Sequence, residues 1–224
     1  MKHILFIVTS TSKTGTGQHD AGYEFSEIAD PYYEFINNGY TVDFASIVGG
    51  EPPFVGYNSS KGANRKFKES QGFKRLNFSH KLNDIDITAY DAIFFPGGLG
   101  LMTDMVDNPL VKKIIKEAYE TEKVIGAVCH GPTALLNVRL TDGSNLLKGK
   151  KINSFTRAEE DIDKHILGDV IPFILDEELI KQGVIFSHTE PFKPFVVNDK
   201  NLVTGQNPAS ASYVALKMID LLTN

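Results

Sequence analysis

The chain has 224 residues, and its 42% of hydrophobic residues suffice for one sizeable core. The 23 basic and 28 acidic side chains give a net charge of −5, which disfavours a nucleic-acid-binding surface. No apolar run approaches the roughly 20 residues of a membrane helix, and a single cysteine excludes an internal disulfide. We therefore expect a cytoplasmic protein with neither a membrane nor a nucleic-acid partner.

Short runs of β-branched and aromatic residues alternate with longer amphipathic stretches along the chain. This pattern predicts βαβ units, and hence an α/β fold with a mostly parallel sheet covered by helices on both faces. The predicted strands are 3–9, 40–46, 92–95 and 124–128, followed by 151–154, 184–186, 195–197 and 202–204.

Helices are predicted between these strands from apolar spacing and capping residues. The apolar residues of 25–36 keep helical spacing, and Gly39 stands where a C-cap belongs. A second helix should run over 109–121 with Asn108 as its N-cap, and Asn207-Pro208 should open the last helix in the same way.

The segment 57–81 differs from its surroundings, because it carries seven basic residues against one acidic residue, Glu69. We interpret it as a surface insertion or lid, with a surface for an anionic ligand or partner as the alternative. No linker-like composition divides the chain, so we predict a single domain over 1–224.

The single cysteine, Cys129, directly follows the strand predicted at 124–128. Ala127 and Gly131 flank it in the small–x–nucleophile–x–small form of a nucleophile elbow, where a cramped strand-to-helix turn leaves no room for bulk. A helix starting near Pro132 would bring N–H groups and a positive dipole to the sulfur, which favours the thiolate. We therefore predict a reactive, ionised thiol in an open hollow, with an inert buried cysteine as the alternative.

A glycine-rich loop, Pro96-Gly97-Gly98-Leu99-Gly100, follows another predicted strand. Ligands of open α/β sheets bind beyond the carboxyl ends of the strands, so this loop and Cys129 should share one rim. A backbone N–H near Gly98 and another near His130 could then form an oxyanion site. The alternative is a plain tight turn.

Acidic residues occur at two places that could serve this cysteine. Glu24, Glu27 and Glu34 fall near one helical line, which is usually a solvated face. Pro31, however, removes the helical partner of the Glu27 carbonyl, and the resulting bend or new cap is compatible with an acid that lines a pocket.

The second place is the stretch that begins at Thr156. Thr156 and Glu159 form a capping box, which gives Glu159 a structural role. Glu160 has no such explanation and is free to orient His130, as the acid of a Cys-His-Glu arrangement does.

Cofactor and metal motifs are incomplete. Gly15-Thr16-Gly17 follows the first strand, but Asp20 stands where a dinucleotide fingerprint has its third glycine. The histidines other than His130 show no metal-ligand spacing; they are His3, His19, His80, His165 and His188. We therefore predict neither a cofactor nor a metal.

Four separated motifs resemble the ThiJ/PfpI superfamily, in particular its heat-inducible chaperone and glyoxalase III branch. They are Ala-Val-Cys-His-Gly-Pro at 127–132, the glycine loop at 96–100, Ser-Phe-Thr with the two following glutamates at 154–160, and Thr-Gly-Gln-Asn-Pro-Ala-Ser at 204–210. The resemblance implies a flavodoxin-like three-layer sandwich, similar to class I glutamine amidotransferases, and a homodimer.

Carried over by position, the resemblance implies a role for each candidate site residue. Cys129 matches the family nucleophile, His130 its neighbour, and Glu160 the acid of the triad. Glu27 matches the acid that contacts the cysteine from the first helix, and Gly98 matches the oxyanion loop.

One position of that loop departs from the family pattern, which often has a histidine between the glycines. Here the residue is Leu99, and the lost polar group could change substrate choice or weaken catalysis. Gly97, Gly98 and Leu99 are the predicted oxyanion and substrate-binding residues. The metal-bearing domain of some chaperone members is absent, so no metal is carried over.

The resemblance implies a cofactor-independent glyoxalase III-type lyase (D-lactate dehydratase). Such an enzyme converts methylglyoxal and related 2-oxoaldehydes to 2-hydroxy acids through a cysteine nucleophile. Two alternatives stay open at this point. One is a stress-responsive holdase chaperone or a redox sensor that works by cysteine oxidation. The other is a thiol peptidase or amidase, which a Cys-His-Glu set also permits.

Overall fold

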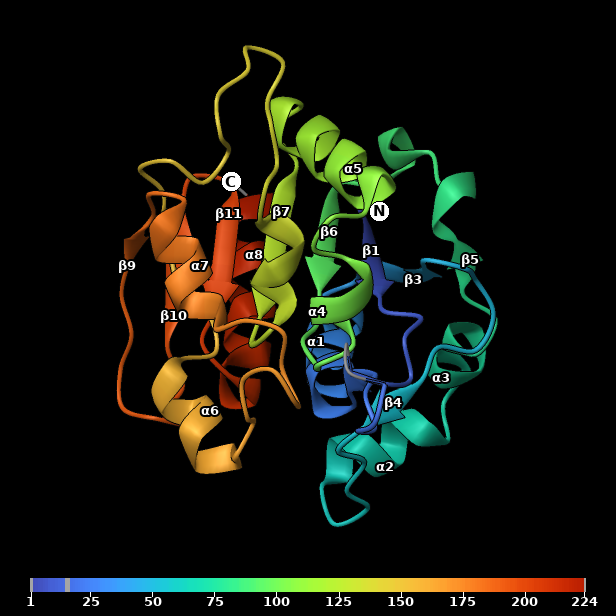
Figure 1. Cartoon of the computed structure of the whole chain (residues 1–224). Coiled ribbons are helices and arrows are strands. Elements are labelled where there is room, and N and C mark those ends of the chain that lie inside the picture. The colour runs from blue at the N-terminus through green and yellow to red at the C-terminus, as the bar shows by residue number, and fades with distance from the viewer. Residues whose placement is uncertain (1, 15–16, 224) are drawn as a thin grey trace.

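A seven-stranded sheet forms the centre of the computed structural model, which describes residues 2–14 and 17–223 (Figure 1). Its strands are β1 (His3–Val8), β3 (Thr41–Ser46), β5 (His80–Lys81), β6 (Ala92–Phe95), β7 (Val124–Val128), β10 (Val196–Asp199) and β11 (Leu202–Gly205). Their order is β10-β11-β7-β6-β1-β3-β5, with β10 antiparallel to β11 and the other pairs parallel. Two short parallel pairs lie outside it, namely β2 (Tyr23–Glu24) with β4 (Phe54–Val55) and β8 (Lys151–Ile152) with β9 (Ile185–Phe186).

Helices connect the strands and cover the sheet. They are α1 (Ser26–Asn37), α2 (Gly62–Lys68), α3 (Gln71–Leu76), α4 (Leu101–Asp104), α5 (Pro109–Glu120), α6 (Arg157–Asp163), α7 (Leu175–Lys181) and α8 (Ala211–Thr223). Short 3₁₀ turns are η1 (Leu82–Asp84), η2 (Ile87–Ala89), η3 (Gly131–Leu135) and η4 (Pro208–Ser210). Among the helices of the described residues, none combines the length and the apolar character needed to cross a membrane.

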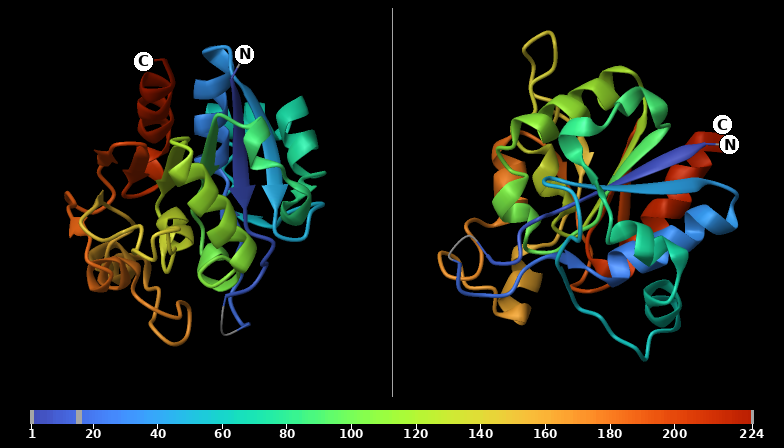
Figure 2. Two further views of the ribbon diagram at one scale, coloured as in Figure 1. Left: turned by 90° about the horizontal axis from the view of Figure 1, so that it is seen from above. Right: turned by 90° about the vertical axis from the view of Figure 1, so that its right-hand side faces the viewer.

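The two faces of the sheet are covered by different helices, because side chains alternate along a strand. On β1, Leu5 and Ile7 belong to the buried cluster that includes the apolar residues of α5 and α7. Ile4 and Phe6 belong to the opposite cluster, with the apolar residues of α1 and α8. The views in Figure 2 show these helices on either side of the strands. The predicted flavodoxin-like three-layer arrangement is confirmed.

Local capping signals hold where the sequence placed them. The Asn108 side chain accepts from the N–H groups of Leu110 and Val111, with Pro109 in the first turn of α5. Thr156 and Glu159 form the predicted capping box at the start of α6. These are short-range patterns, so the sequence alone determines them.

Three predicted elements differ from the structure. Of the strand expected at 151–154, only Lys151–Ile152 is a strand, and it pairs with β9 outside the central sheet. The last helix begins with the 3₁₀ turn η4 before α8. The element after Cys129 is the five-residue 3₁₀ turn η3 rather than an α-helix. Gly15 and Thr16, from the incomplete dinucleotide motif, lie outside the described residues.

The basic segment 57–81 contains α2 and α3, and its apolar residues reach into the core. Phe67 and Phe73 are buried in the same cluster as α1. The ammonium of Lys68 lies 4.0 Å from the ring centre of Phe73 and 4.4 Å from that of Phe54. The segment is therefore anchored by aromatic packing on one side while its other basic side chains face outward; its role as a lid stays a prediction.

Candidate active site

Cys129 lies on a sharp turn at the carboxyl end of β7. Its φ is +60°, a left-handed conformation that is uncommon for a residue with a side chain. The turn is held by two backbone hydrogen bonds, from Cys129 N–H to the Gly205 carbonyl (2.9 Å) and from Phe155 N–H to the Cys129 carbonyl (2.9 Å). A Cβ at Gly131 would lie 2.3 Å from the Phe95 carbonyl oxygen, so this position needs glycine. The geometry is that of the predicted nucleophile elbow.

The glycine loop lies beside the elbow because β6 and β7 are parallel neighbours, with Phe95 paired to Ala127. A Cβ at Gly97 would lie 2.7 Å from Cys129 Cβ and 2.8 Å from the backbone nitrogen of His130. Gly98 has a φ of +112°, which L side chains rarely adopt. A side chain at Gly97 would therefore collide with Cys129, and glycine lets the backbone of the loop pack directly against the cysteine.

The thiol of Cys129 is buried, with 4% of the residue exposed, and not placed in an open hollow as the sequence suggested. Burial and the neighbouring Glu27 carboxyl raise the pKa of the Cys129 thiol well above its ordinary value. The predicted lowering of the thiol pKa is not found: burial and the neighbouring carboxyls raise it, and the element that follows Cys129 is a 3₁₀ turn rather than the expected α-helix. The thiol must therefore lose its proton to a neighbouring group during the reaction.

Glu27 is the first such group, and it is completely buried on α1. Its Oε2 accepts a hydrogen bond from the Gly97 N–H, whereas its Oε1 has no hydrogen-bond partner among the described residues. Burial, with a smaller contribution from Glu24, raises the pKa of the Glu27 carboxyl well above its ordinary value. Glu27 is thus a protonatable acid beside the sulfur, as the resemblance implied.

His130 is the second neighbour of the thiol, with Nδ1 3.4 Å from Cys129 Sγ. Its other ring nitrogen, Nε2, lies 2.8 Å from Glu160 Oε1, and both side chains are almost fully buried. An ionised carboxylate only accepts hydrogen bonds, so the proton of a neutral His130 ring is on Nε2 and the lone pair of Nδ1 faces the thiol. The structure therefore brings Cys129, His130 and Glu160 together in the predicted order.

Glu160 is ionised in this position. Burial raises the pKa of its carboxyl, but His130 and His165 together outweigh burial and lower the pKa to about 2. Glu159, its neighbour on α6, instead accepts from Thr156, Phe192 N–H and Asn207, so its role is structural as predicted.

Fewer backbone N–H groups of the glycine loop are available to bind an oxyanion than the sequence suggested. The N–H of Gly97 is already taken by Glu27. In residues 2–14 and 17–223, the N–H groups of Gly98 and His130 meet no acceptor, which leaves them free for a developing oxyanion. Leu99 is partly buried against the cluster on the α5 side of the sheet.

Two neighbours of the site escaped the sequence reasoning. Glu24, assigned to a solvated face, is largely buried on β2, where Ser26 Oγ donates to it and burial raises the pKa of its carboxyl. His165, set aside for lack of ligand spacing, places Nδ1 2.6 Å from Glu160 Oε2. The two residues are only five positions apart, and the left-handed Lys164 at the end of α6 turns the chain so that they meet; the sequence reasoning did not consider this helix end.

The donor atoms of His130, Glu160 and His165 lie within 4.8 Å of one another and are the cluster of the described residues that could hold a metal ion. Each histidine, however, hydrogen-bonds to a different oxygen of the same carboxylate, at 2.8 and 2.6 Å. These distances match charge-assisted hydrogen bonds, so the contacts within the cluster are accounted for without a metal.

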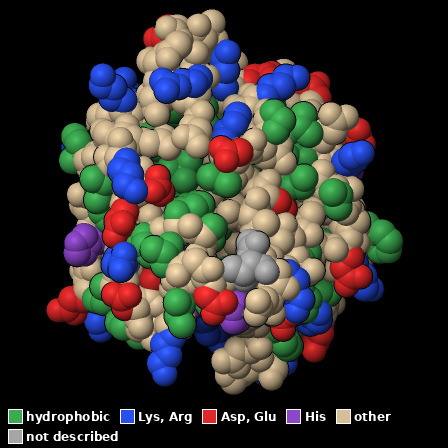
Figure 3. All heavy atoms as spheres, in the orientation of Figure 1, with side chains coloured by type: hydrophobic (Ala, Val, Ile, Leu, Met, Phe, Trp, Pro, Cys, Tyr) green, Lys and Arg blue, Asp and Glu red, His purple; other side chains and the backbone are tan. Residues whose placement is uncertain are grey.

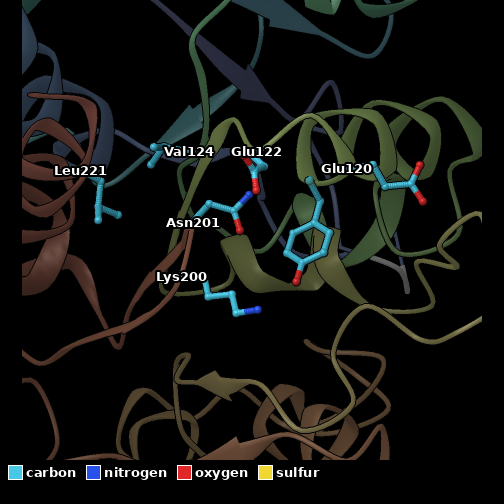
Figure 4. Close-up of a pocket in the computed structure, with 7 residues that line it drawn as sticks. Glu120, Glu122, Val124, Lys200, Asn201 and Leu221 are labelled. Carbon is cyan, nitrogen blue, oxygen red and sulfur yellow. The ribbon is translucent and has the colours of Figure 1, made fainter. Parts of the chain in front are cut away.

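Surface hollows lie on several sides of the molecule. One of about 390 Å³ borders Glu160 and His165, on a face where apolar and charged side chains of both signs are interspersed (Figure 3). Another of about 470 Å³ lies among Val124, Asn201, Lys200 and Glu122 (Figure 4). It lies at the amino end of β7, opposite Cys129, and has no part in the site.

Comparisons with known proteins identify the family of the chain. The DJ-1/PfpI family model matches residues 19–221. The chain is 30% identical to glyoxalase 3 of Candida albicans, over 98% of each chain. It superposes on a Francisella tularensis rapid encystment protein with a TM-score of 0.94 and 34% identity, over 100% of each chain. A structure titled glyoxalase III from Candida albicans gives a TM-score of 0.87 at 28% identity, over 98% of this chain and 97% of that one.

Proposed function

The chain belongs to the DJ-1/PfpI family, and from this membership and its site we propose that it is a glutathione-independent glyoxalase. The enzyme needs no cofactor and converts methylglyoxal and related 2-oxoaldehydes to 2-hydroxy acids such as D-lactate. One observation supports this most strongly: the strained Cys129 has a protonatable acid, Glu27, on one side and a basic ring nitrogen of His130 on the other.

The first step is addition of Cys129 Sγ to the aldehyde carbon of the substrate. The S–H proton passes to His130 Nδ1, whose lone pair faces the sulfur at 3.4 Å. Glu160 stabilises the resulting imidazolium through Nε2. Protonated Glu27 donates a proton to the aldehyde oxygen and is left ionised, and the product is a hemithioacetal.

The second step moves a hydrogen between the two oxygen-bearing carbons. Glu27, ionised by the first step, removes the proton from the former aldehyde carbon while the His130 imidazolium gives its proton to the ketone oxygen, and the product is an enediol. The Glu27 carboxyl then returns its proton to the adjacent carbon, and the hydroxyl on the former aldehyde carbon gives its proton back to His130. This leaves a 2-hydroxy thioester on Cys129. The N–H groups of Gly98 and His130 hold the oxyanion that develops at each stage.

The last step is hydrolysis. Water adds to the thioester carbonyl, its hydroxyl stays with the acyl carbon, and the thiol regains a proton as the 2-hydroxy acid leaves. The net reaction adds one water to one 2-oxoaldehyde, so no oxidant or cofactor is required.

Methylglyoxal turnover without glutathione tests the proposal. Cys129→Ala should abolish turnover, while Cys129→Ser retains the size of the side chain and shows whether the weaker nucleophile suffices. Wild-type activity in Cys129→Ala would end the proposal. Folding of each variant is checked by its thermal melting curve.

The expected binding partner of the site is a small-molecule substrate. Two further expectations concern the oligomeric state of the protein and its location in the cell. We expect a homodimer, which light scattering after gel filtration would detect. Exposed apolar residues at and beyond α6, namely Ile162, Ile166 and Leu167, offer area for a second copy to cover. A single free thiol suits the reducing cytoplasm.

A further inference from the structure

His165 extends the site by one residue beyond the nucleophile, its histidine and its acid. Glu160 uses Oε1 for His130 at 2.8 Å and Oε2 for His165 at 2.6 Å. We propose that His165 is a positioning residue that fixes the Glu160 carboxylate so that Oε1 faces His130. The inference rests on the proposed function, because it concerns how the same site works.

The end of α6 is shaped to deliver His165 to this carboxylate. Lys164 ends the helix in the left-handed conformation, with φ +59°. The chain thereby turns back, and the His165 N–H donates to the Glu160 carbonyl at 2.9 Å. A non-glycine residue in this conformation costs free energy, which the surrounding contacts must offset.

The direction of the hydrogen bonds shows what His165 does. Glu160 is ionised and can only accept, so His165 donates from Nδ1 to Oε2 and His130 donates from Nε2 to Oε1. His165 therefore orients Glu160, and Glu160 orients His130 toward Cys129 Sγ. The three distances are 2.6 Å from His165 to Glu160, 2.8 Å from Glu160 to His130, and 3.4 Å from His130 to the sulfur.

The hydrogen bond from His165 matters because the Glu160 carboxylate is buried. The Glu160 side chain is 1% exposed, so an oxygen left without a donor cannot turn to bulk water. Without His165, rotation or protonation of the carboxylate would weaken the hydrogen bond that Oε1 accepts from His130. The His165 side chain is 22% exposed at the hollow beside α6, so it can be replaced with little loss of core packing.

The ring of Phe155 supports the arrangement from one side. Its centre lies 4.8 Å from that of His130 and 6.3 Å from that of His165. Both imidazoles thus pack near the same aromatic ring, and each donates a hydrogen bond to a different oxygen of Glu160.

Two substitutions at this position separate positioning from general structure. His165→Ala removes the donor to Oε2. His165→Asn keeps one, because the asparagine amide nitrogen reaches nearly the position of the histidine Nδ1. His188→Ala is the matched control, since that ring is exposed, lies near the ring of Phe186 and forms its hydrogen bond with the carbonyl of Thr189, away from Glu160. We expect His165→Ala to lower kcat for methylglyoxal by about tenfold with KM nearly unchanged, the scale of losing an outer partner of an oriented histidine or carboxylate.

A spectroscopic readout accompanies the kinetics. The His130 Nε2–H that donates to buried Glu160 should give a low-field proton NMR resonance, identified by its loss in Glu160→Gln. His165→Ala should shift or broaden it, whereas His165→Asn and His188→Ala should retain it, and His165→Asn should regain most of kcat.

The proposal is overturned if His165→Ala keeps both wild-type kcat and the wild-type resonance. It is equally overturned if His165→Asn loses as much as His165→Ala, since the donor would then not be the reason. If the wild-type protein fails to turn over methylglyoxal, the proposed function falls, and the resonance comparison still decides the role of His165.

Discussion

The carboxylate of Glu27 accepts a hydrogen bond from the backbone N–H of Gly97, 70 residues further along the chain. This contact joins α1 to the glycine loop and brings the acid to the nucleophile. It also takes up one oxygen of Glu27 and leaves the other buried without a hydrogen-bond partner among the described residues. The hydrogen bond fixes the position of the Glu27 carboxyl, and its burial keeps its pKa above the ordinary value.

Replacing Glu27 by glutamine should separate chemistry from folding. We expect Glu27→Gln to lower kcat by about 10²–10⁴-fold, the usual contribution of a general acid–base group. The amide has a similar size, so the contact with Gly97 demands little rearrangement. Steady-state turnover of methylglyoxal measures the effect, and a loss below threefold would argue against a proton-transfer role.

We also expect Glu27→Gln to change how the stability of the folded protein depends on pH. The pKa of Glu27 is raised in the folded state above its ordinary value of 4.5, so its stabilising contribution is present below pH 4.5. It is lost as pH rises through the folded pKa, because the buried carboxyl must then ionise. Glu27→Gln should therefore gain stability relative to wild type between pH 5 and 8. Urea denaturation at both pH values measures the difference, and parallel curves would contradict it.

Glu160 should show the opposite dependence. Its pKa of about 2 in the folded protein lies below the ordinary 4.5, so its contribution is present above 4.5 and is lost as pH falls through 2. A shift of this size corresponds to about 3 kcal/mol. Wild type should lose more stability than Glu160→Gln between pH 6 and pH 3. An equally steep decline in the variant would show that Glu160 is not held ionised by its histidines.

The glycine loop should not tolerate even one methyl group at Gly97. A Cβ there would lie 2.6 Å from Glu27 Oε2 and 2.7 Å from Cys129 Cβ, so Gly97→Ala must push the acid and the nucleophile apart. We expect at least a tenfold loss of kcat and a lower melting temperature. Gly62→Ala is the control, because a Cβ at that helical position meets nothing within 4 Å and alanine favours a helix.

The buried thiol should react slowly with reagents that need a preformed thiolate. Its pKa is raised by burial and by Glu27, so iodoacetamide should alkylate Cys129 more slowly at pH 7 than it alkylates a cysteine peptide. The same argument predicts slow oxidation by hydrogen peroxide, which disfavours a redox-sensor role. Alkylation faster than that of the peptide would show a standing thiolate and restore that alternative.

Features that depend on residues close together in the chain could be predicted before the structure was known. The alternation of buried strands and amphipathic stretches predicts the layered fold, Asn108 and Thr156 mark helix starts, and Ala127 and Gly131 mark the elbow at Cys129. Four motifs in order then indicate the family and the residues of the site.

The burial and the protonation of those residues follow from the folded chain. It buried the Cys129 thiol and raised its pKa, turned Glu24 inward, and brought Glu27 to Gly97 and Glu160 to His130. Burial and charge at a residue depend on everything packed around it, and most of those neighbours are distant in the chain. Periodicity and capping patterns extend over only a few residues, so they cannot carry that information.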